Sequence, residues 1–320
     1  MLLSIVMPVY NSEKFLKQCL DSIVFQLSVN TEIIIVDDSS IDNSKAILYD
    51  YLEKIDPEKK ILIKIISLEE NKGVGYARML AISNASGKYI CSIDPDDIVS
   101  NNYIYDITSI LKKYDPDVLQ FHISRFTENI EDRYILSSNF LIEGLHEING
   151  KLKKDFYEQN FWSFCTRVIK RNLFDNVNFS NLRNCEDVYA LPLIIAKINN
   201  IYILDKDLYY YRLNLESLSK SSKNIANAKK SYKYILDVYE EKLKEDTDLY
   251  YAFIPILRGY IEFCLKYTGY KNSCDELNYY KKKIRYFPYN IRFFSKLSHN
   301  LFILFGVKFL LIFGLIRGKK

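Results

Sequence analysis

The sequence predicts an α/β fold in which a mostly parallel sheet carries helices on both faces, followed by a C-terminal helical region. Three observations support this prediction. Short, nearly continuous apolar runs alternate with amphipathic segments over residues 1–120, as expected of parallel strands covered on both sides. Acidic clusters follow two of these runs, at the strand ends where such sheets bind ligands. From residue 223 onward the chain reads as helices rich in Tyr, Lys and Leu.

Each apolar run predicts one element. The expected strands of the first part are residues 2–7, 32–36, 61–66, 88–93 and 118–123. The first expected helix is capped by Ser12 and has Leu16, Leu20, Ile23 and Leu27 on one face. Further helices are expected at residues 43–54, 73–85 and 102–113. Residues 125–220 are less regular, with strands expected at 140–142, 165–169 and 201–204 and a helix at 188–197.

The composition excludes several classes of protein. Of the 320 residues 48% are hydrophobic and 26% charged, which is ordinary for a globular protein and excludes bulk disorder. Six scattered cysteines without a Cys-x-x-Cys pair exclude a zinc ribbon or disulfide framework and indicate reduced thiols in a cytosolic setting. Three separated histidines exclude a His-Glu-x-x-His protease. No secretory leader is expected, because no basic segment precedes the short first apolar run.

Charge is unevenly distributed along the chain. Residues 221–320 hold 19 Lys and Arg against 9 Asp and Glu, whereas residues 1–220 hold 25 against 31. This shift and the serine-rich segment 217–222 predict a boundary near residue 220. We therefore expect one domain at 1–220 and a basic helical region at 221–320, with different partners.

Asp94-Pro95-Asp96-Asp97 is the strongest chemical signal in the sequence. Three carboxylates within four residues repel one another, which suggests a cation between them. Hard oxygen ligands suit Mg²⁺ or Mn²⁺, which bind through one or two carboxylates plus substrate phosphates. A solvated turn with an aspartate capping the next helix explains the tetrapeptide as well, so the metal site stands as one of two interpretations.

Three further segments lie where a ligand of such a sheet would bind. Asp38 ends the second strand, where an acidic residue can hydrogen-bond a base or ribose, or cap a helix. Pro8 and Tyr10 end the first strand, and the Tyr10 ring offers a face to a base, although Pro also marks ordinary turns. Residues 71–78 open a helix whose glycines permit close backbone approach. Arg78 could there reach a phosphate, or be a solvated side chain.

Glu186 and Asp187 precede the apolar run 188–195. Acidic residues at a helix start are stabilised by the helix dipole, which is a sufficient structural reason for both. The functional interpretation is a general base.

Taken together, these segments resemble the family 2 glycosyltransferases of the GT-A fold. The resemblance is strong over residues 1–105, looser to about residue 220, and absent beyond. It rests on residues 4–11, 32–42, 71–78 and 85–90 running into 94–97, followed by Trp162, Lys170-Arg171, Phe174, Glu186-Asp187, Tyr209-Tyr210-Tyr211-Arg212 and Ser217.

The resemblance implies that residues 1–120 form the nucleotide-binding half of the domain. Asp38 would contact the base, with Tyr10 stacking nearby and Pro8 beside it. Arg78 would face the nucleotide, and Asp94 would contact the ribose side.

The remaining roles concern the metal and the acceptor. Asp96 would coordinate Mn²⁺ or Mg²⁺ bridging the diphosphate, and Arg212 is a further candidate for contact with the diphosphate. Asp187 would take the proton from the acceptor hydroxyl, with Glu186 as its neighbour. Residues 121–220 would form the acceptor half.

The implied activity is inverting, metal-dependent transfer of a sugar from a nucleotide-sugar, by family preference a UDP-sugar. The acceptor would be a hydroxyl of a glycan or lipid-linked molecule in surface polysaccharide biosynthesis. Two alternatives stay open. Residues 89–98 look like the Asp-x-Asp-x-[Thr/Val] motif of haloacid-dehalogenase phosphatases, although that motif normally sits on the first strand. A membrane-bound scaffold without turnover would keep the same fold.

The C-terminal region predicts association with a membrane surface. Residues 301–316 include 13 apolar residues of 16, and as one helix would span roughly 24 Å, short of a bilayer core of about 30 Å. Lys308 lies at the middle, and basic and aromatic residues precede the segment, which suits an anionic membrane. We expect a peripheral protein on the cytosolic face, or alternatively a C-terminal helix packed on the domain or in a dimer. No nucleic-acid motif accompanies the basic cluster, so nucleic acid is not an expected partner.

Overall fold

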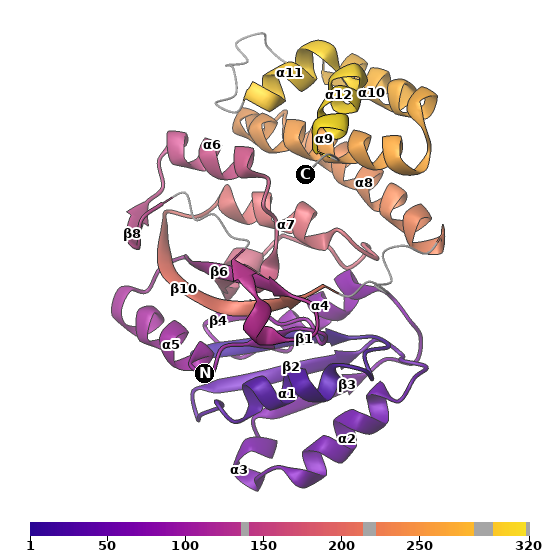
Figure 1. Ribbon diagram of the computed structural model, residues 1–320. Coiled ribbons are helices and arrows are strands. Elements are labelled where there is room, and N and C mark those ends of the chain that lie inside the picture. Colours follow the sequence, from indigo (N-terminus) through magenta and orange to yellow (C-terminus); the bar gives the residue numbers. More distant parts are fainter. Residues whose placement is uncertain (136–140, 214–221, 285–296, 318–320) are drawn as a thin grey trace. The chain divides into compact units, whose positions relative to one another are not determined.

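The computed structural model describes residues 1–135, 141–213, 222–284 and 297–317 (Figure 1). The chain divides into two compact units, Met1–Ile148 with Ser163–Ser217, and Asn149–Trp162 with Leu218–Lys320. The boundary expected near residue 220 falls outside the described residues. Residues 149–162 group with the second unit, although they lie within the first in sequence.

A mixed sheet forms the centre of the first unit. In the described ranges it has ten strands, of which eight follow the order β3-β2-β1-β4-β9-β6-β10-β5, with β7 beside β6 and β8 beside β10. The strands are β1 Leu3–Val9, β2 Thr31–Asp37, β3 Ile63–Ser67, β4 Tyr89–Ser92, β5 Ile98–Val99, β6 Val118–Phe126, β7 Tyr134–Ile135, β8 Gly144–Glu147, β9 Arg167–Lys170 and β10 Asn200–Arg212.

The parallel part of this sheet explains the apolar runs of the sequence. Strand β1 pairs in parallel with β2 and β4, β2 with β3, and β6 with β10. Every residue of β1 is buried, as expected of a central strand covered on both faces. Strand β9 runs antiparallel between β4 and β6. The predicted α/β fold with a mostly parallel sheet is confirmed.

Helices cover both faces because the chain reverses direction along the sheet. The steps from β1 to β2 and from β2 to β3 run one way, and the step from β3 to β4 runs back. Right-handed crossovers then place α1 and α2 on one face and α4 on the other (Figure 1). The helices of this unit are α1 Leu16–Val24, α2 Ser44–Lys54, α3 Pro57–Lys60, α4 Val74–Ser83, α5 Tyr103–Tyr114 and α7 Glu186–Ile195, with 3₁₀ turns at Ile130–Asp132, Phe164–Thr166 and Arg171–Phe174.

Several local predictions differ from the structure, among them the strand expected at 201–204, which extends over Asn200–Arg212 as β10. Ser12 does not cap α1 with its side chain, because its hydroxyl donates to the carbonyl of Tyr10. Residue 140 of the strand expected at 140–142 lies outside the described residues, and 141 and 142 are not strand; the nearby strand is β8. Strand β9 starts at Arg167 instead of residue 165, because a 3₁₀ turn occupies the preceding residues.

The second unit is helical, as the sequence predicts. Its helices are α6 Gly150–Gln159, α8 Ser222–Lys242, α9 Tyr250–Tyr267, α10 Tyr270–Ile284, α11 Leu297–Phe305 and α12 Val307–Arg317, with a 3₁₀ turn at Thr247–Leu249. Tyrosine rings fill its core: Tyr260 lies 5.6 Å from Tyr232 and 6.2 Å from Tyr280, measured between ring centroids.

The single helix predicted over residues 301–316 is wrong. Gly306 has a φ of 57° and separates α11 from α12. A Cβ atom at this position would lie 2.8 Å from a methyl group of Leu277, so the break needs glycine for both its conformation and its packing. Across the described ranges, no helix is both long and apolar enough to span a membrane.

Candidate active site

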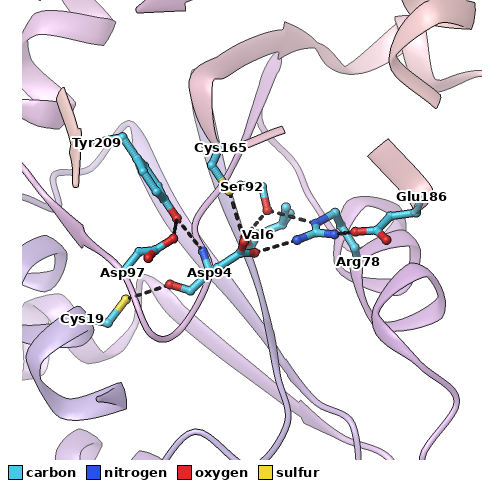
Figure 2. Close-up of polar contacts among 9 residues, drawn as sticks. All are labelled: Val6, Cys19, Arg78, Ser92, Asp94, Asp97, Cys165, Glu186 and Tyr209. Atoms are coloured by element: carbon cyan, nitrogen blue, oxygen red, sulfur yellow. Dashed lines mark hydrogen bonds and ion pairs between the residues drawn. The ribbon is translucent and has the colours of Figure 1, made fainter. Parts of the chain in front are cut away.

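Arg78 links Asp94 to Glu186 in the polar network at the carboxyl edge of the sheet (Figure 2). Its Nε donates to the Ser92 hydroxyl at 3.1 Å, and its Nη2 lies 2.7 Å from an Asp94 carboxylate oxygen. Its Nη1 forms an ion pair with Glu186, and its guanidinium carbon lies 5.6 Å from the centroid of the Phe164 ring. Arg78 is buried and joins α4, β4, the following loop and α7 into one site.

Asp94 begins the acidic loop, residues 94–97, and is held from several sides. Its second carboxylate oxygen accepts from the Cys165 thiol at 3.3 Å. Its backbone N–H donates to the Tyr209 hydroxyl at 3.0 Å, and its carbonyl accepts from the Cys19 thiol at 3.5 Å. Its side chain remains about one third exposed, so a ligand can still reach this carboxylate.

Asp97 anchors the other end of the acidic loop. Its carboxylate is buried and accepts from the Tyr209 hydroxyl at 2.6 Å and from the Arg212 N–H at 2.8 Å. Burial, followed by the charges of Asp96 and Asp94, raises the pKa of Asp97 well above its ordinary value. The hydrogen bonds that Tyr209 and Arg212 donate to the Asp97 carboxylate offset part of the cost of burying its charge.

Asp96 is the carboxylate of the loop that fits a metal ligand. No other residue in the described part of the chain donates a hydrogen bond to its carboxylate or pairs with it. Burial, and then the Asp94 charge, raises the pKa of Asp96 to about 6, so a bound cation would relieve a real electrostatic cost. Among the described residues, no cluster of three or more His, Cys, Asp or Glu able to hold a metal occurs.

Arg212 supports the backbone of the acidic loop. Its guanidinium lies between the Phe15 and Phe126 rings, 4.4 and 4.5 Å from their centroids. Its Nε donates to the Asp96 carbonyl at 2.9 Å, and its Nη2 to Gln18 at 2.5 Å. The structure thus shows a positioning role, and contact with a diphosphate stays a prediction.

Asp187 and Glu186 open helix α7 and have different surroundings. Glu186 is buried against Arg78. The Asp187 carboxylate accepts from the Val188 N–H at 2.7 Å, and Cys185 before it has a positive φ of 62°. Burial raises the pKa of Asp187 to about 6, with the nearby Arg78 charge acting against the rise. A carboxylate with a pKa near neutrality is suited to accept a proton.

Asp38 binds the loop that leads into α4. One carboxylate oxygen accepts from the Lys72 N–H at 2.7 Å, and the other from Gly73 at 2.8 Å and the Asn71 side chain at 3.0 Å. Asp38 is buried, and contact with a base stays a prediction. Pro8 is buried at the end of β1, and Tyr10 after it is half-buried.

The glycines of this loop serve packing between segments of the protein. Gly73 has a φ of 97°. A Cβ on Gly75 would lie 2.3 Å from the Leu182 carbonyl oxygen, which accepts the Gly75 N–H at 3.1 Å. The close backbone approach predicted for these glycines is therefore real, but the partner seen here is the backbone near residue 182.

Sequence reasoning gave no role to three residues that shape the site: Ser92, Cys165 and Tyr209. A serine within the apolar strand β4 is the signal that could have identified Ser92, because a buried hydroxyl needs a partner. Cys165 and Tyr209 lie 71 and 115 residues from Asp94, and no local pattern connects them to it.

Comparison with known proteins agrees with this geometry. The sequence model of Glycosyl transferase family 2 matches residues 4–184. Glycosyltransferase GlyG of Streptococcus pneumoniae serotype 4 is 29% identical over 280 residues, covering 86% of this chain and 89% of that protein. The UDP-Glc:alpha-D-GlcNAc-diphosphoundecaprenol beta-1,3-glucosyltransferase WfgD of Escherichia coli is 29% identical over 272 residues, 84% of this chain and 98% of that protein.

A solved structure shows the same fold. The crystal structure of S. aureus TarS 1–349 in complex with UDP-GlcNAc superimposes with a TM-score of 0.60 at 18% identity, covering 88% of each chain. The fold is therefore GT-A, and the phosphatase interpretation of residues 89–98 is wrong. The chain belongs to glycosyltransferase family 2 and is a glycosyltransferase.

Proposed function

We propose that the protein is an inverting, divalent-metal-dependent glycosyltransferase that uses a UDP-sugar. The acceptor is a hydroxyl of a glycan or lipid-linked molecule in surface polysaccharide biosynthesis. The observation that carries this proposal is the Arg78 bridge, which binds Asp94 of the acidic loop and Glu186 beside Asp187. One side chain thereby links the donor-side carboxylates to a base with a pKa of about 6.

The chemistry follows from this arrangement. The acceptor oxygen attacks the anomeric carbon as the bond between that carbon and the diphosphate oxygen breaks, and Asp187 receives the acceptor proton. The nucleoside diphosphate leaves with the bonding electron pair. A single displacement inverts the anomeric centre, so an α-linked donor gives a β-linked product.

Mn²⁺ or Mg²⁺ would be held by Asp96, with Asp94 beside it, and would stabilise the negative charge of the leaving diphosphate. Asp97 and Arg212 keep the acidic loop in place through the Tyr209 hydroxyl and the Asp96 carbonyl. Binding of the metal requires an ionised Asp96 and should release a proton near pH 6.

Substrate classes of the relatives support the donor and acceptor. The name of WfgD specifies UDP-Glc and a diphosphoundecaprenol-linked acceptor, and the TarS structure contains UDP-GlcNAc. In this chain, Tyr10 and Asp38 would contact the uracil. Arg78 would face the nucleotide.

Metal-dependent UDP binding is expected to depend on Asp96. In the wild type, UDP with Mn²⁺ should raise the unfolding temperature more than UDP with EDTA, because a ligand at 100 times its Kd adds about 2.7 kcal/mol. In Asp96→Ala the difference between Mn²⁺ and EDTA should vanish. Asp50 is exposed, so Asp50→Ala serves as the control and should retain the difference between Mn²⁺ and EDTA. GDP, CMP and TDP provide the comparison of bases, and an undiminished Mn²⁺ effect in Asp96→Ala would refute the metal assignment.

We further propose that the second unit attaches the enzyme to the cytosolic face of a membrane. Helices α11 and α12 bury Phe302, Val307 and Leu310, but leave apolar side chains in contact with solvent. Leu304, Phe305, Leu311 and Ile312 are 67, 60, 40 and 63% exposed. Lys308 among them is exposed and basic, which favours an anionic lipid surface.

The membrane proposal is tested by sedimentation with vesicles of phosphatidylglycerol and of phosphatidylcholine. Each buried apolar side chain contributes about 1.5–3 kcal/mol. Changing Leu304, Phe305 and Ile312 together to Ser should therefore weaken binding to anionic vesicles at least about tenfold. A control variant with Val29, Ile41 and Ile61 changed to Ser removes three apolar side chains that are even more exposed, and it should bind like the wild type. Equal binding of both variants would contradict the proposal.

A further inference from the structure

Arg125 and Tyr211 form a pair at the same sheet edge as the acidic loop. They are register partners on the parallel strands β6 and β10, and the Arg125 guanidinium carbon lies 5.7 Å from the Tyr211 ring centroid. Tyr211 is 38% exposed. It follows Tyr209 by two residues, so both rings point to one face of β10. Tyr209 is bonded to Asp94 and Asp97 on that face.

The charges of the acidic loop act on the Tyr211 hydroxyl. Burial, followed by the charges of Asp97, Asp96 and Asp94, raises the pKa of Tyr211 to about 12, and Arg125 opposes the rise. The hydroxyl is therefore neutral at physiological pH and within electrostatic reach of the acidic loop.

Arg125 differs from Arg78, Arg133 and Arg212, each of which donates side-chain hydrogen bonds. Its Nε is buried and has no hydrogen-bond partner within the described ranges, and no acidic side chain there forms an ion pair with it. Arg133 provides the contrast: it stacks on Tyr210 at 4.8 Å but also donates to Asp207 at 3.2 Å. A buried unmatched donor costs about 1–3 kcal/mol, and a guanidinium is the side chain best shaped to recover this on a phosphate.

We propose that Arg125, with Tyr211 against its guanidinium, binds a phosphate group of a substrate. This deepens the proposed function and rests on it. Strands β1 and β2 lead into Tyr10 and Asp38 and lie on one side of β4. Strands β6 and β10 lie on the other side of β4. On this strand order, the acceptor is the substrate to which we assign the phosphate.

The test measures binding of inorganic phosphate, without turnover. Thermal unfolding of the wild type, Arg125→Gln, Arg125→Lys and Arg133→Gln is followed across a phosphate titration. Arg125→Gln should weaken the apparent affinity for phosphate at least about tenfold, which is the loss of one charged hydrogen bond or more. Arg125→Lys should retain part of the wild-type affinity for phosphate, and Arg133→Gln should retain all of it. An equal phosphate response in the wild type and Arg125→Gln would overturn the proposal.

A second titration, with saturating UDP and Mg²⁺, separates the two sources of phosphate. If the Arg125-dependent response persists, the acceptor assignment stands; if UDP abolishes it, the site belongs to the donor diphosphate and the acceptor assignment is wrong. The UDP-induced shift itself should be unchanged in Arg125→Gln. A loss of UDP binding in every variant would count against the proposed function and leave the phosphate result standing. If Arg125→Gln does not fold, the phosphate affinities of Tyr211→Leu and Arg125→Lys are compared with that of the wild type instead.

Discussion

Replacing Asp187 with Asn is expected to lower kcat by about 10²–10⁴-fold, the usual contribution of a general base. Asparagine preserves the size of the side chain and its hydrogen bond from Val188, so the fold and donor binding should be retained. UDP release from UDP-glucose, UDP-galactose, UDP-GlcNAc and UDP-GalNAc measures turnover, with water or an added glycan as acceptor. The exposed Asp205→Asn removes one negative charge elsewhere in the same unit and should change kcat by less than about twofold.

The pH dependence tests the same residue independently. The pKa of Asp187 is about 6 and lies above the ordinary carboxyl value because of burial. Activity should therefore be full above this value and should fall as the pH drops through 6, because the protonated acid cannot accept a proton. Asp96 titrates in the same range, so the profile is measured at saturating Mn²⁺. A wild-type acid limb that persists unchanged in Asp187→Asn would show that another group is the base.

Removing Arg78 is expected to produce the largest loss of stability among single substitutions at the site. Arg78→Leu leaves Glu186 buried without its cation and Asp94 without its strongest partner. Breaking a buried ion pair from one side typically costs about 3–5 kcal/mol. Urea unfolding followed by circular dichroism measures the change. Arg78→Lys keeps the charge, yet cannot bond Ser92, Asp94 and Glu186 together, and should lose less.

A double variant distinguishes the ion pair from simple loss of packing. Glu186→Gln in the Arg78→Leu background removes the stranded charge, so it should recover part of the lost stability. No recovery would mean that the cost of Arg78→Leu comes from its packing on Phe164 and its bond to Ser92. The pKa of Asp187 should also change in Arg78→Leu. Loss of the Arg78 charge raises the Asp187 pKa, which moves the acid limb of the rate profile to higher pH.

The parts of the fold that the sequence predicts are those with short-range signals. Strands β1, β2 and β4 are mostly apolar because both of their faces are covered. Helices α5 and α7 bury most of their apolar residues. The break at Gly306 is different. It lies within a continuous apolar segment, and its reason is the contact with Leu277 on another helix.

The candidate site divides in the same way. Asp96 and Asp187 stand in compact acidic motifs that draw attention by residue type, but their proposed roles come from the family resemblance. The bond from Tyr209 to Asp97 spans 112 residues, and the ion pair of Arg78 with Glu186 joins α4 to α7 across a similarly long stretch. Such contacts depend on strand order and register, which residue spacing does not encode.

Helix α6 has a consequence for how the protein can be made. It lies early in the chain, yet packs on α9 of the second unit and buries Phe156 and Tyr157. During synthesis α6 therefore leaves the ribosome well before its partner exists, and its apolar face must wait uncovered. A fragment ending near residue 220 would keep that face exposed permanently and is prone to aggregate. Expression of the first unit alone thus requires a short loop in place of residues 149–162.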